Sequence, residues 1–175
     1  MDTQISQEQA VEPPVDVCQK GDVVIQEILP PAPIDLDDPD RLPSPLEKVW
    51  PYVEDMIRKA ILSSDLLQKL ETPKDVFNNL MANNYGLWVI LADGGIKAAI
   101  TMGIERKPRA QICKCYLCGG TEIERWMGPF YDYIIEQARN ADCRFLQFEG
   151  RSEAWERLLK PYKFQKTSET FTLEI

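Results

Sequence analysis

The spacing of apolar residues predicts two consecutive helices in the first half of the chain. Ser44-Pro45-Leu46-Glu47 has the form of a capping box with proline at the first helical position, and apolar residues then recur at helical spacing from Val49 to Ala60. Thr72-Pro73-Lys74-Asp75 repeats this start signal and predicts a shorter helix that ends at about Asn83.

The helical spacing of apolar residues then ends, and the segments that follow are typical of strands. Extended segments are predicted at residues 85–93, 96–106 and 111–117. Asp93-Gly94-Gly95 predicts a tight turn between the first two segments, and Lys107-Pro108-Arg109-Ala110 predicts a turn before the third. Short connections between consecutive strands predict an antiparallel meander.

A third start signal, Thr121-Glu122-Ile123-Glu124, predicts a long helix whose apolar face extends to Ala138. Gly128-Pro129 is expected to bend or restart this helix. Because a helical crossover precedes it, the strand predicted at residues 143–150 should lie parallel to the strand at 111–117.

A short helix at residues 152–160 and a last strand at 164–175 complete the expected order α-α-β-β-β-α-β-α-β. This order predicts the α+β class, with a mixed sheet flanked by helices.

Length and composition indicate an ordinary globular protein. The 175 residues suffice for one domain plus some excess, and 44% of them are hydrophobic. No apolar run approaches the roughly 20 residues of a membrane helix, and the first residues do not resemble a signal peptide. We therefore expect a soluble intracellular protein without membrane contact. The chain has no histidine, which excludes histidine bases, histidine-based triads and histidine metal ligands.

The net charge of −8 is concentrated near the N-terminus. Residues 1–41 hold ten acids and two bases, whereas residues 42–175 hold eighteen of each. The first segment is also rich in proline, and such a composition does not favour an independent core. We therefore predict an acidic, proline-rich extended arm or linker at residues 1–43 and a folded domain at residues 44–175.

Two interpretations of this arm stay open: a solvated tail, or a segment that becomes ordered on a protein partner. In the second case its apolar residues would contact the partner, namely Val24, Ile25, Ile28, Leu29, Ile34 and Leu36. The sequence contains no basic stripe and the arm is acidic, so we expect no direct contact with nucleic acid.

The five cysteines are expected to be reduced, because their number is odd and three of them lie close together. Candidate zinc ligands are Cys113, Cys115, Cys118 and Cys143. Only the Cys115 and Cys118 pair has a usual zinc spacing, so buried structural thiols are the favoured interpretation and no metal is expected.

The predicted order of elements over residues 44–175 resembles the GNAT acyltransferase fold, in which a meander is followed by a β-α-β unit and a closing helix and strand. The segment "ARNADCRFLQFEGRSEAWERLLKPYKF" also resembles the C-terminal half of GNAT-like proteins from tailed bacteriophages. Such proteins are often encoded beside head genes, and some are virion-associated. This resemblance implies a location in the host cytoplasm or in the virion.

GNAT enzymes bind acetyl-CoA through a motif of the form Gln/Arg-x-x-Gly-x-Gly/Ala, which holds the pyrophosphate at the start of the next helix. The resemblance assigns this role to Gly119, Gly120 and Thr121. Tyr116 and Leu117 stand where Gln or Arg is expected, so the motif is degenerate. The acids that follow would place negative charge where a diphosphate would bind.

Many GNAT enzymes also use a tyrosine in a Tyr-x-x-x-Gly-Phe run as a general acid. Matching Phe164 to that phenylalanine places Leu159 at the tyrosine position and Lys163 at the glycine. Tyr162 and Glu149 are therefore only candidates for acid and base, and no catalytic residue is assigned.

The leading hypothesis is thus a GNAT-like phage protein without catalysis and without a cofactor, which contacts phage structural proteins as a virion-associated or head-assembly component. The alternative is an acetyl-CoA-dependent N-acetyltransferase that acts on a protein or a small amine.

Overall fold

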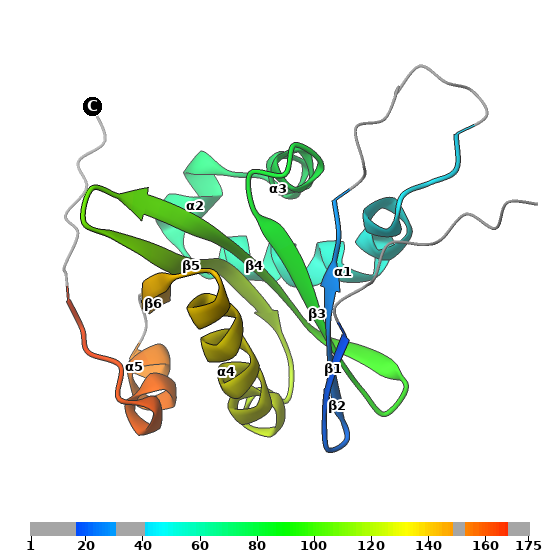
Figure 1. Cartoon of the computed structure of the whole chain (residues 1–175). Helices are drawn as coiled ribbons and strands as arrows, with labels where there is room; N and C mark the ends of the chain where they lie inside the picture. The colour runs from blue at the N-terminus through cyan, green and yellow to red at the C-terminus, as the bar shows by residue number, and fades with distance from the viewer. Residues whose placement is uncertain (1–16, 31–40, 149–152, 168–175) are drawn as a thin grey trace, which may run out of the picture.

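The computed structural model describes residues 17–30, 41–148 and 153–167 (Figure 1). In chain order the elements are β1 (Val17–Lys20), β2 (Val23–Ile28), α1 (Pro45–Leu62), α2 (Asp65–Leu70), α3 (Pro73–Met81), β3 (Gly86–Ala92), β4 (Gly95–Lys107), β5 (Ala110–Gly120), α4 (Ile123–Asn140), β6 (Cys143–Phe148), α5 (Glu153–Leu159) and a 3-10 turn at Lys160–Tyr162.

The strands form one six-stranded sheet with the order β1-β2-β3-β4-β5-β6. Among the described strands, neighbours are antiparallel from β1 to β5, and only β5 and β6 are parallel. The predicted meander and the predicted parallel crossover are therefore both confirmed. The β3–β4 turn also has the expected form, since Asp93 and Gly94 both have positive φ angles, 51° and 73°.

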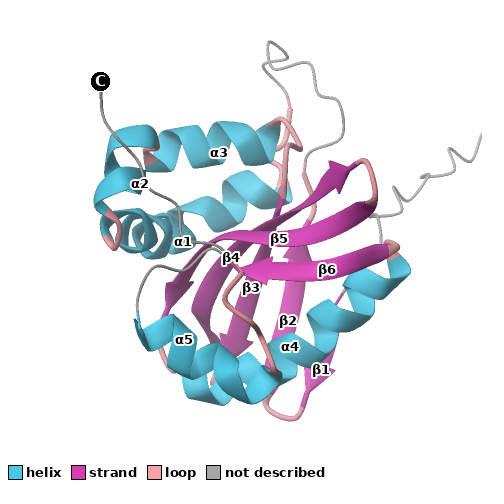
Figure 2. Ribbon diagram, turned by 90° about the vertical axis from the view of Figure 1, so that its left-hand side faces the viewer, coloured by secondary structure: helices cyan, strands magenta, loops and turns pink. Residues whose placement is uncertain are grey.

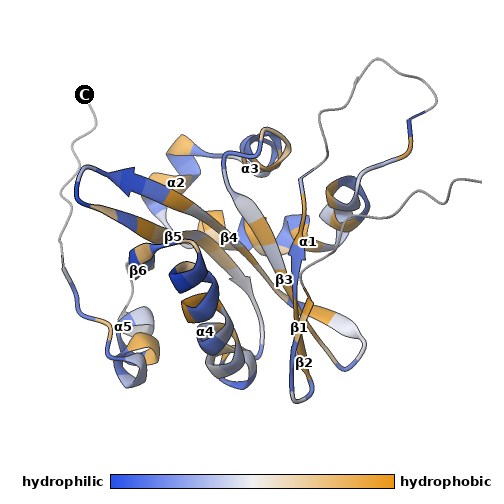
Figure 3. Cartoon of the chain, viewed as in Figure 1, coloured by the Kyte–Doolittle hydropathy of each residue, from blue (hydrophilic) through white to orange (hydrophobic). Residues whose placement is uncertain are grey.

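Helices cover both faces of the sheet (Figure 2). Helices α1, α2 and α3 lie on one face, and α4 and α5 lie on the other. One core cluster packs between the sheet and α4 around Trp126 and Phe130, and the other packs between the sheet and α1 around Val53 and Ile57. Figure 3 shows apolar residues along β3 and the middle of β4, and polar residues along much of α4.

The predicted helix starts at Ser44 and Thr72 are confirmed, because both residues form complete capping boxes. Helix α4 continues as one element through Pro129 and is not restarted there. The short helix α2 was not expected, since its six residues carry too few apolar positions for a periodic signal.

The prediction of an extended arm at residues 1–43 is wrong for residues 17–28. These residues form the β1–β2 hairpin, and β2 pairs with β3. Ile25 and Ile28 are buried in the core at 0% and 4% exposure, so they cannot bind a partner as an exposed peptide. Val24 is half-buried in the same strand and Leu29 is half-buried just after it.

Ile34 and Leu36 lie outside the described residues, so their proposed contact with a partner stays a prediction. The last predicted strand is not found at residues 164–167, and its remainder lies outside the described residues. Within the described part of the chain, no helix combines the length and apolarity that crossing a membrane requires.

Candidate functional site

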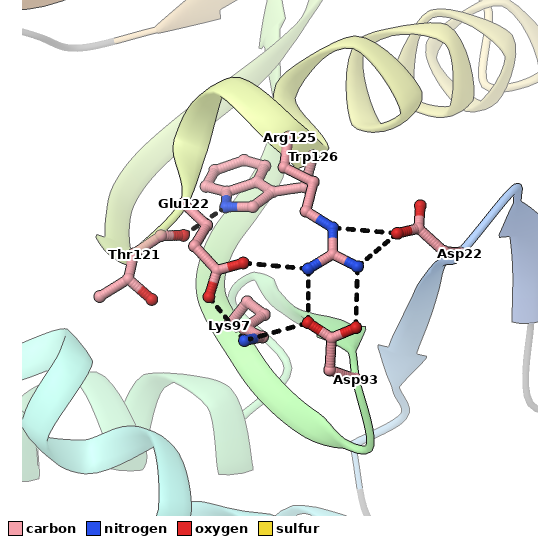
Figure 4. Close-up of polar contacts among 7 residues, drawn as sticks. All are labelled: Asp22, Asp93, Lys97, Thr121, Glu122, Arg125 and Trp126. Carbon is pink, nitrogen blue, oxygen red and sulfur yellow. Dashed lines mark hydrogen bonds and ion pairs between the residues drawn. The ribbon is translucent and has the colours of Figure 1, made fainter.

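The candidate site is the junction between β5 and α4, where the sequence predicted a cradle for phosphate. Strand β5 ends at Gly120, Thr121 follows, and α4 begins at Ile123 after the N-cap residue Glu122. Figure 4 shows this junction with the side chains that surround it. The predicted cofactor residues Gly119, Gly120 and Thr121 are therefore contiguous at the start of a helix, as expected.

Both glycines are required by close packing of the protein on itself. A Cβ atom on Gly119 would lie 2.1 Å from the carbonyl oxygen of Met56 in α1. A Cβ atom on Gly120 would lie 2.4 Å from the carbonyl oxygen of Lys97 in β4, and the φ angle of Gly120 is 156°. These close approaches explain why glycine is needed at both positions, and the explanation does not require a bound ligand.

The backbone amide and carbonyl of Thr121 are also engaged within the protein. Its amide donates to the carbonyl oxygen of Lys97 at 2.8 Å, and its carbonyl oxygen accepts from the indole nitrogen of Trp126 at 2.7 Å. Because Trp126 is 2% exposed, its indole fixes the first turn of α4 to the core. Neither backbone group of Thr121 is therefore free to bind a ligand.

The residue at the N-cap position is Glu122, which has a left-handed backbone with φ 56° and ψ 39° and makes no side-chain cap. This conformation costs a non-glycine residue about 1 kcal/mol. Its carboxylate accepts from Lys97 Nζ at 2.5 Å and from Arg125 Nη1 at 3.1 Å. These two ion pairs hold the strained residue in place.

Arg125 connects the start of α4 to two turns of the sheet (Figure 4). Its Nε donates to Asp22 in the β1–β2 turn at 3.0 Å, and its Nη2 donates to Asp93 in the β3–β4 turn at 2.9 Å. We call this set the Arg125 network: Asp22, Asp93, Lys97, Glu122 and Arg125.

The Arg125 network contains three carboxylates and two cations, so its net charge is −1. Hydrogen bonds from Arg125 lower the pKa of Asp93 to about 2 and also lower the pKa of Asp22. Hydrogen bonds from Lys97 and then Arg125 lower the pKa of Glu122. All three carboxylates are therefore ionised at neutral pH, beside the helix start where a diphosphate would bring more negative charge.

A β-bulge precedes the junction. Thr101 pairs with Leu117 and Met102 pairs with Cys115, so Tyr116 is an extra residue in β5. The amide of Leu117 donates to the hydroxyl oxygen of Thr101 at 3.1 Å, and Thr101 is fully buried. The Leu117 amide at the bulge is therefore hydrogen-bonded within the protein.

The bulge also lies where the described pairing between β5 and β6 ends. The last pair is Cys115 with Phe148, whereas β5 continues to Gly120. The chain after Phe148 is outside the described residues, and so is Glu149, the predicted candidate base.

Tyr162, the candidate acid, is turned toward α4. Its ring lies 4.6 Å from the ring of Tyr131, centroid to centroid, and its hydroxyl oxygen would lie 3.5 Å from a Cβ atom on Gly128. Tyr162 is thus half-buried beside the second turn of α4.

Glu105 in β4 is a carboxylate that could be considered as a general base. It is paired with Lys107 and Lys114, and the hydrogen bond from Lys107 lowers its pKa, which does not suit that role.

The four candidate zinc ligands do not form a metal site. Among the described residues, which include all four, no three His, Cys, Asp or Glu side chains are grouped to hold a metal ion. Burial raises the pKa of Cys113 and of Cys118 to about 12, so both are protonated. The thiol of Cys115 donates to the carbonyl oxygen of Leu117 and that of Cys143 donates to Ala141, each a structural contact.

Sequence reasoning identified the junction and the acid at Glu122 but missed the rest of the Arg125 network. Asp22 and Arg125 are 103 residues apart, and Asp93 and Arg125 are 32 residues apart. In the sequence, the Arg125 network is indicated only by an aspartate beside a glycine in each of two turns. This combination is too common to single out these two turns.

Comparison with known proteins gave matches among solved structures. No protein-family model matches the chain, and no curated protein matches it either. A GCN5-related N-acetyltransferase from Ralstonia eutropha JMP134 has 19% identity and a TM-score of 0.54, and the match covers 74% of this chain and 92% of that chain. A predicted acetyltransferase from Clostridium acetobutylicum, solved with acetyl-CoA, has 17% identity and a TM-score of 0.54, and covers 73% and 90%.

An integron cassette protein from V. cholerae is similar over more of the chain. It has 12% identity and a TM-score of 0.57, and the match covers 87% of this chain and 93% of that chain. Identities this low show the fold alone. Together with the mixed six-stranded sheet and its flanking helices, these similarities show that the chain has the GNAT fold.

Proposed function

We propose that this chain uses the GNAT fold to bind a protein partner and does not transfer acetyl groups from CoA. The observation that carries the proposal is the Arg125 network at the start of α4. A helix start binds phosphate through its amide groups and its positive end. In this chain that end is next to three carboxylates, and both cations of the network are already paired.

The repulsion between a bound diphosphate and the carboxylates of the Arg125 network can be estimated. One phosphate charge about 5 Å from one carboxylate costs on the order of 1 kcal/mol in water, and more where water is excluded. A diphosphate brings two charges to a network whose net charge is −1. GNAT enzymes have Gln or Arg in the motif, and Tyr116 and Leu117 at the matching positions of this chain supply no cationic or amide side chain.

The test is a thermal-shift titration of the full chain with acetyl-CoA. A ligand at 100 times its Kd stabilises the folded state by about 2.7 kcal/mol, which is readily measured. We expect no shift up to millimolar acetyl-CoA. Glu124 is in the first turn of α4, where a helix tolerates proline, and proline removes the backbone amide donor whereas alanine keeps it. A saturable shift in Tm that is reduced in Glu124→Pro but kept in Glu124→Ala would show that this amide binds acetyl-CoA. That result would contradict the proposal.

The alternative function is an acetyl-CoA-dependent N-acetyltransferase that acts on a protein or a small amine. Two observations favour it: the bulge at Tyr116 beside the end of the β5–β6 pairing, and Tyr162 beside α4. The amides of Ile123 and Glu124 are also in the first turn, where helices leave their donors without an intrahelical acceptor. An assay of free thiol release from acetyl-CoA, with Tyr162→Phe as the variant, tests it; general acid catalysis predicts a loss of about 100-fold or more.

We further propose that the partner is a structural protein of a tailed bacteriophage, and that the chain takes part in head assembly or becomes part of the virion. The support is the resemblance of residues 138–164 to phage GNAT-like proteins. Mass spectrometry of purified particles of the virus that encodes the chain tests this directly. Detection in stoichiometric amounts supports a virion component, and absence from both particles and head precursors contradicts the proposed role.

A further inference from the structure

Cations from three separate elements lie together at one end of the sheet. We call them the basic surface: Arg106, Lys107 and Arg109 at the β4–β5 turn, Arg139 at the end of α4, and Arg144 in β6. Figure 3 shows the β4–β5 turn as a strongly hydrophilic end of the molecule. The sequence does not display this surface, because its members are up to 38 residues apart.

Gln111 in β5 shows that the three elements meet. It pairs with Arg106 on one side and with Cys143, which precedes Arg144, on the other. Its side-chain amide donates to the carbonyl oxygen of Ala141 just after α4, at 3.4 Å. The basic surface is therefore one contiguous region around the start of β5.

The basic surface is far from the Arg125 network. Strand β4 begins next to the Asp93 turn and runs for 13 residues to Lys107, a length of about 40 Å. The molecule is thus acidic at one end of β4 and basic at the other.

The charges of the basic surface are exposed and largely uncompensated. Within the described residues, no acid forms an ion pair with Arg106, Arg109 or Arg139, and all three are exposed. Lys107 pairs with Glu105, and the other acid in these segments is Asp142. Five cations therefore stand against two acids.

Exposed apolar side chains lie beside these cations on both faces of the sheet: Ile104 pairs with Cys113, which faces α4, whereas Phe145 pairs with Ile112, which faces the other side. Phe145 in β6 is 53% exposed, and the Arg144 guanidinium lies 5.5 Å from its ring centroid. Ile104 in β4 is 48% exposed. A surface of arginines and exposed apolar groups suits a partner segment that is both acidic and aliphatic.

The chain itself contains segments of that chemistry. Residues 1–16 and 31–40 hold eight acids and no base, which equals the whole net charge of −8, so the rest of the chain holds twenty of each. Residues 31–40, with the sequence PAPIDLDDPD, combine four aspartates with Ile34 and Leu36.

We propose that residues 31–40 of a second copy bind to the basic surface, with the aspartates beside the arginines and the aliphatic side chains against Phe145. The inference rests on the proposed function, in which the chain works through protein contacts, and it adds a contact between two copies of the chain to the proposed contact with a phage structural protein. The contact can close as a reciprocal dimer, in which each copy donates residues 31–40 to the other, or continue head-to-tail beyond a dimer. A nucleic acid is the less suitable occupant, since the net charge of −8 repels phosphates at long range.

The first test is fluorescence anisotropy of the full chain with a labelled synthetic peptide of residues 31–40. We expect saturable binding that weakens between 50 mM and 500 mM NaCl, because the Debye length falls. Arg106→Glu/Arg109→Glu should weaken binding at least tenfold. The matched control is Lys48→Glu/Lys74→Glu, which changes the net charge equally at exposed lysines in the first turns of α1 and α3.

Binding that both double variants retain equally overturns the proposal, and so does an absence of binding at low salt. Binding of a single-stranded oligonucleotide in place of the peptide would assign the surface to nucleic acid and also overturn it. Analytical ultracentrifugation supplies the second test: the full chain should associate with concentration at low salt, and Arg106→Glu/Arg109→Glu should stay monomeric. A monomer at all concentrations refutes the contact between copies, whatever the outcome with acetyl-CoA.

Discussion

Replacing Gly119 with alanine tests whether this glycine serves packing or ligand binding. The added Cβ would lie 2.1 Å from the carbonyl oxygen and 2.7 Å from the carbonyl carbon of Met56. Both atoms belong to the backbone of α1, so no side-chain rotation can relieve the overlap. The helix and the strand must separate by on the order of 1 Å across a close-packed core.

Overpacking of this kind typically costs 1–3 kcal/mol and occasionally more. Because the contact is with the backbone, we expect Gly119→Ala to lower the free energy of unfolding by about 3 kcal/mol. For a chain of this size that corresponds to a decrease in Tm of roughly 6–12 °C.

The assay is urea and thermal unfolding, followed by circular dichroism without any ligand. Gly95→Ala is the matched control: a Cβ there meets no atom within 4 Å and its φ angle is not positive. This control should change stability by less than about 1 kcal/mol. Equal stability of Gly119→Ala and Gly95→Ala would refute the packing explanation and return Gly119 to the candidate cofactor residues.

Three further predictions concern the network, the bulge and the thiols. Arg125→Met should lose less stability than the unchanged protein when the pH is lowered. In the folded protein Arg125 lowers the pKa of Asp93 to about 2, below the pKa of about 4 that this carboxyl has in the unfolded chain. The resulting stabilisation is present above about pH 4 and is lost as the pH falls toward 2. Urea unfolding across that range measures the effect, and identical pH profiles for both proteins would contradict it. Thr101→Val should destabilise by about 1–3 kcal/mol in urea unfolding, because the buried Leu117 amide loses its acceptor; a neutral result would mean that this amide has another partner. Cys113 should react with DTNB at pH 8 only after unfolding, because its thiol is buried and burial raises its pKa to about 12; fast reaction of this thiol in the native state would refute that burial.

The sequence predicted the part of the fold that local patterns encode. Capping boxes at Ser44 and Thr72 and the glycine turn after Asp93 give local start and stop signals, and all three are present in the structure. The β1–β2 hairpin was missed because its signal is short. Val23 and Ile25 alternate correctly around the turn at Gly21, but the acidic, proline-rich residues on both sides dominate the composition.

The candidate site was predictable only where its parts are adjacent in sequence. Gly119 and Gly120 revealed a tight junction, but the atoms that they approach belong to Met56 and Lys97. The bulge at Tyr116 was equally hidden: it moves Leu117 to the α1 face, although strict alternation places this residue with Cys115 on the α4 face. Long-range pairing decides both features, and a single sequence does not display it.

Whether the start of α4 binds CoA is best decided by an NMR titration of the isotope-labelled full chain with acetyl-CoA, observing the backbone amides of residues 121–125. These are the groups that would hold the pyrophosphate, and their signals report contact residue by residue. We expect that these signals do not move at millimolar acetyl-CoA. Saturable shifts of the Ile123 and Glu124 amides would contradict this expectation and favour the acetyltransferase.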